Sequence, residues 1–285
     1  MDGIIVVKKE KGMSSFDVIR SLRKILQERK IGHTGTLDPL ATGILILCVG
    51  KATRLAQEIE AEEKIYEAEM EFGYQTDTYD LEGKVLAESL KKEVSRGEFE
   101  KVLKKWKGDI LQVPPMYSAI KLQGKKLYEL ARKGVEVERE ARKVTVFEIH
   151  TLEFQQTKAK ILTKVSKGTY IRSLIHDIGK DLGSFATMTA LNRIQVGEHT
   201  LKNAYTISEI HDRIKICDFS FCIPVEEYFL FPKIQLEGEK NRSLFQNGNT
   251  VIFQEKDGKY RVYQEEVFLG LGKIEHQRLK GYKYF

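Results

Sequence analysis

The sequence predicts an α/β (α+β) fold built on a mixed sheet, followed by a small all-β module. Two observations favour this fold class. Strand and helix patterns interleave over about the first 230 residues without a strict β-α-β rhythm, and only short strand patterns follow them. The 285 residues of the chain suffice for one large domain and such a module.

The first expected elements are a strand and a helix. Residues 4–7 form a short β-rich run, typical of a buried strand. Ser14 can cap the helix that follows, with Asp17 in its first turn. Apolar residues then repeat at helical spacing and predict one buried helix face. These residues are Val18, Ile19, Leu22, Ile25 and Leu26.

The next elements are a strand and a lysine-rich helix. Residues 66–72 alternate apolar side chains with glutamates, which predicts a strand whose buried face includes Tyr66. Residues 99–106 carry the apolar stripe of a helix, and Gly108 follows near its end. We therefore expect Trp106 in the core rather than at a base-stacking surface.

Two paired strands and a further helix complete the large domain. Residues 144–154 and 161–165 look like strands joined by a polar turn. Apolar residues from Leu174 to Leu182 repeat as one face of a helix. A helix is thus expected after these two strands, before the sequence changes to short strand patterns.

Short strands dominate the C-terminal segment. Asp257-Gly258 predicts a hairpin between residues 251–253 and 260–263. Residues 267–272 add another strand. A small β-module is expected to begin near residue 230.

Composition excludes several classes of protein. The chain is 41% hydrophobic and 31% charged, with no apolar run long enough to span a membrane and no secretory signal, so we expect a cytoplasmic protein. The three cysteines are an odd number and lack the spacing of a disulfide framework, so we expect no structural disulfides. Cys217 and Cys222 lack a second ligand pair, which argues against a metal site.

The charge distribution is compatible with an RNA partner. The formal charge is +6, from 47 basic and 41 acidic residues. Basic residues gather in one short stretch, although interleaved glutamates make a solvated surface the simpler interpretation of charge alone. The stretch contains Lys121, Lys125, Lys126, Arg132, Lys133, Arg139, Arg142 and Lys143.

Residues 32–43, GHTGTLDPLATG, form the most informative segment. Three glycines and Pro39 predict a tight loop between the first helix and the apolar run that starts at Ile44. By composition, Asp38 simply begins an Asp-Pro turn. A phosphate-binding loop is excluded, because no Gly-Lys-Ser/Thr follows and Asp38 would repel a phosphate.

The same segment resembles the catalytic signature of the TruB family of tRNA pseudouridine synthases. Further stretches resemble that family's motifs in the same order, across residues 3–230. They are KGMSS (11–15), KIY (64–66), GYQTDTYDLEG (73–83), PPMYSA (114–119), KGTYIRSL (167–174) and LNR (191–193).

The resemblance implies a domain organisation. Residues 1–229 would form the catalytic domain of the pseudouridine synthase fold, with a mixed, largely antiparallel sheet. Residues 112–143 would be an RNA-binding thumb inserted into it. Residues 230–285 would form a shortened, PUA-like RNA-binding module, for which LFQNG (244–248) and FLG (268–270) are weak matches. An OB-like module or a merely structural cap stays open.

The resemblance also implies the activity. The enzyme would flip uridine 55 out of the T-loop of tRNA and reattach its uracil through carbon. Asp38 would be the nucleophile, attacking C1′ of the sugar or C6 of the base, which the sequence does not distinguish. No cofactor or metal is required, because no electron, phosphate or external group is transferred. We expect a monomer that binds the tRNA T stem-loop and needs no membrane or protein partner.

The remaining site residues are assigned by the same resemblance. Arg172 would form an ion pair with Asp38, and Tyr66 would stack on the base and take a proton from C5. Tyr170, expected on a strand with Arg172 and on the same face, would be a pocket wall. The expected substrate-binding residues are His33 (in place of the flipped nucleotide), Leu191 (an apolar lid), Lys11, and the thumb residues Lys121, Lys125, Lys126 and Arg132.

Two other functions are kept as alternatives. The first is a guide-RNA-dependent synthase of the Cbf5/dyskerin type, which carries the same aspartate motif. The thumb-like insertion and the small C-terminal module favour the stand-alone enzyme. The second is a tRNA-binding or tRNA-folding protein whose catalysis is secondary.

Overall fold

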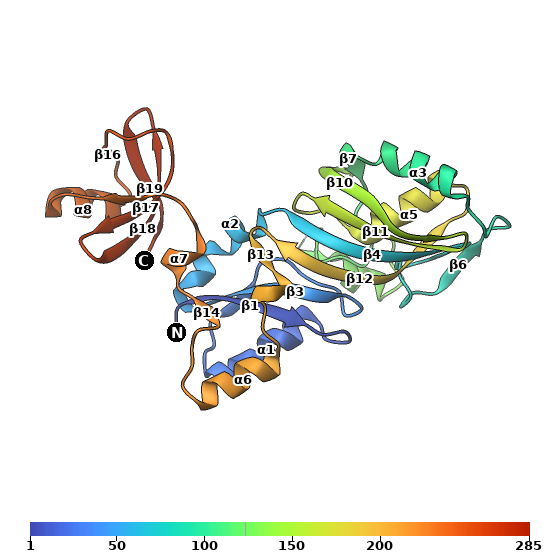
Figure 1. The fold of residues 1–285 in the computed structure, drawn as a ribbon, viewed down its shortest axis with the longest axis horizontal. Coiled ribbons are helices and arrows are strands. Elements are labelled where there is room, and N and C mark those ends of the chain that lie inside the picture. The colour runs from blue at the N-terminus through green and yellow to red at the C-terminus, as the bar shows by residue number, and fades with distance from the viewer. Residues whose placement is uncertain (123) are drawn as a thin grey trace.

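The computed structural model describes residues 1–122 and 124–285. Within them, one large mixed sheet with helices on its faces is followed by a small, separate sheet at the C-terminus (Figure 1). The predicted fold class is therefore confirmed. None of the helices in these described ranges is long and apolar enough to cross a membrane.

The large sheet runs in the order β14-β1-β3-β12-β4-β11-β10-β7, with β2 added to β3 and β13 added to β12. Every neighbouring pair is antiparallel except β3 and β12, which are parallel. Its strands are β1 (Gly3–Lys9), β2 (Ile31–His33), β3 (Thr42–Val49), β4 (Lys64–Phe72), β7 (Gly108–Gln112), β10 (Arg142–Gln155), β11 (Lys158–Val165), β12 (Ala186–Val196), β13 (His199–Thr200) and β14 (Cys222–Ile223).

Helices cover the sheet at two places (Figure 1). α3 and α5 lie against the β10–β11–β4–β12 part, and α1 and α6 lie together beside β1. The helices are α1 (Ser15–Leu26), α2 (Ala56–Glu60), α3 (Arg96–Lys105), α4 (Leu127–Ala131), α5 (Ile171–Asp181), α6 (Ile207–Lys215), α7 (Val225–Tyr228) and α8 (Glu239–Gln246), with 3-10 turns η1 (Gly50–Leu55) and η2 (Leu201–Asn203).

Local sequence patterns explain the first strand and helix. Ser14 and Asp17 form a reciprocal capping box that starts α1. Val18, Ile19 and Leu22 are buried on one face of the helix, as their spacing predicts. β1 occupies the predicted first strand, and every residue of it except Lys8 is buried.

The later predictions in the large domain are also confirmed. β4 buries Tyr66, Ala68, Met70 and Phe72 on one face and leaves the glutamates on the other. β10 and β11 pair as expected. Trp106 packs against the core at the end of α3, and its ring N–H donates to Asp181 over 3.2 Å.

β3 is apolar on both faces because both are covered. Leu45, Leu47 and Val49 face the core under the helices, whereas Ile44 and Ile46 face a second cluster. This second cluster includes Leu271 of the C-terminal sheet, Val225 and Tyr228 of α7, and η1 residues, so it joins the small sheet to the large domain.

The small sheet has the order β15-β17-β18-β19-β16. The predicted hairpin at Asp257-Gly258 is wrong. The strand before it, β16, has only two residues and pairs with β19, where Val251 packs opposite Leu279, whereas β17 pairs with β18. The strands are β15 (Lys233–Gln235), β16 (Val251–Ile252), β17 (Gly258–Gln264), β18 (Val267–Glu275) and β19 (Arg278–Tyr284).

Two hairpins project from the large sheet. β5 (Tyr74–Thr76) and β6 (Val85–Glu88) enclose the loop that contains Asp80. β8 (Lys121–Leu122) and β9 (Lys125–Lys126) lead into α4, between β7 and β10. α4 buries Leu127, and Lys125, Arg132 and Lys133 around it are exposed.

Candidate active site

Asp38 lies in the loop between β2 and β3, and short local contacts hold this loop. The Leu37 N–H donates to the Ser15 hydroxyl over 2.8 Å, and the Gly12 N–H donates to the Pro39 carbonyl over 2.8 Å. Leu37 and Leu40 are buried on either side of Asp38. The Asp38 side chain itself is 32% exposed, so a fixed loop presents a carboxylate that solvent or a ligand can still reach.

Gly43 allows the loop to meet the sheet. It has a φ of +102°, and it pairs with Arg193 where β3 runs parallel to β12. A Cβ at this position would collide with the backbone of Arg193 and with the Asn192 side chain. The glycine therefore permits the close approach that brings Asp38 next to β12.

Two nitrogens of the Arg172 guanidinium contact the Asp38 carboxylate. Its Nε lies 2.9 Å from Oδ2 of Asp38, and its Nη2 donates to Oδ1 over 3.2 Å. The guanidinium is 5% exposed, and it also donates to the carbonyls of Tyr117 (2.8 Å) and Thr78 (3.0 Å). This bidentate pair fixes the orientation of the carboxylate.

A second carboxylate, Asp80, lies on the other side of the guanidinium. Its Oδ2 is 3.5 Å from Nη1 of Arg172, and the Thr78 hydroxyl donates to its Oδ1 over 2.6 Å. Burial raises the pKa of Asp80, while the Thr78 hydrogen bond and Arg172 act in the opposite direction. The sequence analysis included Asp80 in a motif but gave it no role, because nothing local marks it as a partner of Arg172.

Tyr170 and Arg172 do not share a strand, so that prediction is wrong. Tyr170 is the extended residue before α5, and Arg172 lies in the first turn of the helix. The helical repeat identified from Leu174 onward extends back to Ile171, which is buried with the same face. Gln112 of β7 holds Tyr170 by accepting from its N–H over 2.8 Å and donating to its carbonyl over 3.1 Å.

Tyr170 nevertheless borders the predicted site. Burial raises the pKa of its phenol, and the charges of Arg172 and Asp38 are close enough to act on that pKa as well. Tyr170 is therefore a half-buried, uncharged ring beside the ion pair.

Tyr66 lies on the buried face of β4, the strand between β11 and β12 in the sheet. It is 7% exposed, and its hydroxyl is 3.5 Å from Nη1 of Arg193, its partner on β12. Leu191 lies two residues from Arg193 and is also buried. Tyr66 and Leu191 lie on the adjacent strands β4 and β12, two positions apart in their register.

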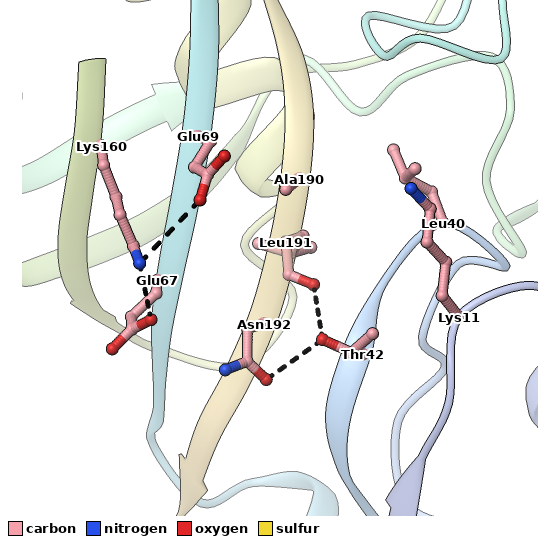
Figure 2. Close-up of a pocket in the computed structure, with 9 residues that line it drawn as sticks. All are labelled: Lys11, Leu40, Thr42, Glu67, Glu69, Lys160, Ala190, Leu191 and Asn192. Carbon is pink, nitrogen blue, oxygen red and sulfur yellow. Dashed lines mark hydrogen bonds and ion pairs between the residues drawn. The ribbon is translucent and has the colours of Figure 1, made fainter.

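A pocket of about 240 Å³ opens beside the Asp38 loop, between β3 and β12 (Figure 2). Thr42 donates to Oδ1 of Asn192 over 3.3 Å, and Lys160 pairs with Glu67 over 3.2 Å. The pocket contains two predicted substrate-binding residues but neither Asp38 nor Tyr66. Its lining is Lys11, Leu40, Thr42, Glu67, Glu69, Lys160, Ala190, Leu191 and Asn192.

Lys9 is a buried cation that sequence reasoning missed. It is 1% exposed, and its ammonium donates to the carbonyls of Met13 (2.7 Å) and Pro39 (3.4 Å). Burial lowers its pKa to about 8, although Asp38 acts to raise it. Lys9 thus joins the start of the chain to the residue after Asp38. Its position beside Lys8 in a strand pattern gave no sign of this.

His33 ends β2 at the entrance to the loop. It is half-buried, and its Nδ1 accepts the Gly35 N–H over 3.3 Å. Burial, with a smaller effect of the Arg193 charge, lowers its pKa. The imidazole is therefore neutral at pH 7, which suits packing better than an ionic contact.

The predicted thumb contacts lie on the segment between β7 and β10, in the β8–β9 hairpin and at the end of α4. Lys121, Lys125 and Arg132 are exposed, and Lys126 is half-exposed. Lys126 and Arg132 both lie 5.4 Å from the centre of the Tyr128 ring, which orders their side chains.

Three family models match the chain. Residues 23–171 match "TruB family pseudouridylate synthase (N terminal domain)", residues 172–219 match "tRNA pseudouridylate synthase B C-terminal domain", and residues 232–283 match "Pseudouridine synthase II TruB, C-terminal". Together they leave short segments of the chain unmatched.

Curated relatives extend over nearly the whole chain. A protein of Fusobacterium nucleatum named tRNA pseudouridine synthase B is 56% identical, covering 100% of both chains. A protein of Clostridium tetani with the same name is 42% identical and covers 98% of both.

Solved structures share the fold. A chain in an H/ACA RNP bound to a substrate RNA containing 2′-deoxyuridine has a TM-score of 0.70 at 24% identity, covering 99% of this chain and 84% of that one. A chain in a Cbf5-Nop10-Gar1 complex has a TM-score of 0.69 at 26% identity, covering 95% of this chain and 78% of that one.

Proposed function

The chain belongs to the TruB family of pseudouridine synthases, and from this premise we propose that it isomerises uridine 55 in the T-loop of tRNA to pseudouridine. The full-length identity to proteins named tRNA pseudouridine synthase B supports tRNA as the substrate. The observation that carries the mechanism is the bidentate pair between Arg172 and Asp38.

In the proposed reaction, the Asp38 carboxylate is the nucleophile and Arg172 orients it. The bond between C1′ and N1 breaks, the uracil turns, and a bond forms between C1′ and C5. The bond that Asp38 forms to C1′ or C6 breaks again before the product leaves. The proton on C5 passes to the Tyr66 oxygen and N1 takes up the proton that this oxygen gave up, so atoms and electrons balance without an oxidant or a cofactor. Tyr170 forms a wall of the pocket beside the ion pair.

His33 and Leu191 are proposed to help hold the extruded nucleotide. Flipping a base costs a few kcal/mol of stacking and pairing, which an inserted ring can partly offset. The neutral, half-buried His33 ring at the loop entrance suits that role. Leu191 and Lys11 line the adjoining pocket, where an apolar surface and a cation can contact base and backbone (Figure 2).

Two basic surfaces are proposed to bind the tRNA backbone. One is the thumb, residues 112–143. The other is the C-terminal module, residues 230–285, where Lys259, Lys273 and Lys280 are exposed and lie directly opposite one another on β17, β18 and β19. Glu275 already pairs with Lys273, and RNA phosphates are the further anions that like charges in register favour.

We propose that the enzyme acts alone, as a monomer in the cytoplasm. Relatives named tRNA pseudouridine synthase B share 42–56% identity with the chain, compared with 26% for the chain in the Cbf5-Nop10-Gar1 complex. The thumb residues lie between β7 and β10, which gives the protein its own basic surface for RNA.

The direct test uses the purified protein and a transcribed tRNA with no guide RNA. Pseudouridine is expected at position 55 and nowhere else in the transcript, mapped by chemical labelling and primer extension. A transcript with cytidine at position 55 is the control. Absence of product with the intact tRNA would reject the stand-alone activity, and product only after addition of a guide RNA would support the alternative.

Charge reversal on the thumb tests its proposed role. In Lys125→Glu/Lys126→Glu, tRNA affinity should fall and its dependence on salt should weaken, because each lost phosphate contact removes about 0.7–0.9 from the slope of log K against log salt. Filter binding from 50 to 300 mM salt measures this. Lys104→Glu/Lys105→Glu, the same change on exposed lysines of α3, is the matched control. A slope equal to that of the wild type would refute the thumb contact.

A further inference from the structure

Arg193 is a buried cation without a carboxylate partner. It is 2% exposed, and no ion pair among residues 1–122 and 124–285 includes it. Its Nε donates to the Ile44 carbonyl over 2.7 Å and its Nη2 to the Gly35 carbonyl over 3.2 Å. Burying an uncompensated charge is costly, so a role beyond packing is required to explain it.

The guanidinium joins three strands at the reacting region. Gly35 lies at the start of the Asp38 loop and Ile44 follows its end, so one side chain ties both ends together. The third contact is Nη1 to the Tyr66 hydroxyl, at 3.5 Å. In the backbone, Arg193 pairs with Tyr66 on one side and with Gly43 on the other.

The positive charge of Arg193 contributes to lowering the pKa of three neighbouring groups. Burial lowers the pKa of Lys64 to about 8, and the Arg193 charge is the next cause. Arg193 also acts to lower the pKa of Lys9 and of His33, after burial. Arg193 is the buried cation that lies beside the Tyr66 hydroxyl, at 3.5 Å. A fixed positive charge at that distance stabilises negative charge that develops on the oxygen in a transition state.

We propose that Arg193 is a positioning residue for removal of the C5 proton: it orients the Tyr66 oxygen and stabilises the negative charge that this oxygen carries as the base. The inference rests on the proposed function, in which Tyr66 accepts that proton. In this step the phenolic proton of Tyr66 leaves the oxygen and is taken up at N1 of the uracil. The C5–H bond breaks, its proton joins the Tyr66 oxygen, and its electron pair restores the C5–C6 double bond, so the phenol is regenerated.

The test measures C5–H cleavage directly. tRNA is transcribed with uridine or with 5-deuterouridine, and single-turnover rates are compared for the wild type, Arg193→Gln and Arg193→Lys. Both variants should slow product formation at least about tenfold, a part of what general-base catalysis contributes. Both should also show a larger hydrogen/deuterium rate ratio than the wild type, because proton removal becomes the slow step. Affinity for tRNA should stay within about twofold, since Arg193 is buried away from the RNA surfaces.

The conservative variant guards against misfolding. If Arg193→Gln fails to fold, the comparison is made with Arg193→Lys alone. Lysine keeps a buried cation at this position but cannot make all three contacts of the guanidinium. The matched control is Arg23→Gln: Arg23 also donates to a backbone carbonyl, of Ile31 (3.3 Å), but lies on α1, outside the proposed catalytic and RNA-binding residues. It should lower stability without changing the isotope ratio.

The outcomes separate this inference from the proposed function. Wild-type protein that makes no pseudouridine contradicts the function itself. Wild-type protein that makes it, with Arg193 variants whose isotope ratio does not rise, overturns the inference alone. The double variant Arg193→Gln/Tyr66→Phe should form product as fast as Tyr66→Phe alone, because Arg193 acts through Tyr66. If the rate losses of the two single changes add in the double variant, the inference is also overturned.

Discussion

Asp38→Asn is expected to reduce pseudouridine formation at least about 10⁴-fold while leaving tRNA affinity within a few-fold, because an amide cannot replace a carboxylate nucleophile. The fold should survive. Arg172 keeps Asp80 and two carbonyl acceptors after the charge at Asp38 is lost. Single-turnover rates on tRNA, with binding measured separately, give both quantities.

The control is Asp109→Asn, the same chemical change at an exposed residue that pairs with Lys143 over 2.7 Å. It should leave turnover unchanged. If Asp38→Asn modifies tRNA at the wild-type rate, the nucleophile is misassigned. If it abolishes modification yet restores the growth of cells that lack the protein, tRNA binding or folding is the main biological role.

The Asp38 region shows which parts of a site sequence patterns can reveal. Gly32, Gly35, Gly43 and Pro39 predict a tight loop from local chemistry alone, and the loop exists as predicted. The pairing of Asp38 with Arg172 spans 134 positions, and no local pattern contains it. Only the resemblance to a family linked the two, and the structure now supplies their geometry.

Residues to which that resemblance assigned no role were missed for the same reason. Asp80 and Arg193 acquire their roles from partners on distant strands, and Lys9 from the carbonyl of Pro39. The error at residues 170–172 has a different origin: two residues were assigned to a strand although the helical repeat beyond them already continued through Ile171. Strand pairing fails similarly at β16, whose partner β19 is set by long-range packing rather than by the nearest turn.

Arg172→Met is expected to lower turnover about 10²–10³-fold, with tRNA affinity changed by less than threefold. Methionine preserves much of the apolar stem but removes every donor that orients Asp38. Because Arg172 is buried, it does not offer its charge to the RNA backbone. Single-turnover rates and filter binding separate the two effects, and the reverse pattern, with affinity lost and turnover kept, would contradict the pairing.

The same change should lower stability by about 3 kcal/mol at neutral pH, because it leaves Asp80 buried without its cation. Burial already raises the pKa of Asp80, and losing Arg172 raises it further. When the folded pKa lies above the unfolded value, the folded state binds more protons between them, and stability falls as pH rises through that window. The deficit of Arg172→Met should therefore shrink as the pH approaches about 4, the ordinary range of a carboxyl group.

Arg172→Met/Asp80→Asn separates the structural role of Arg172 from its catalytic one. Removing the charge at Asp80 eliminates the unpaired carboxylate, so denaturant unfolding should show most of the lost stability restored and the pH dependence flattened. Turnover should stay as low as in Arg172→Met, because Asp38 still lacks the two hydrogen bonds that orient it. If turnover returned together with stability, Arg172 would act only by supporting the fold around Asp80, and its contact with Asp38 would have no catalytic consequence.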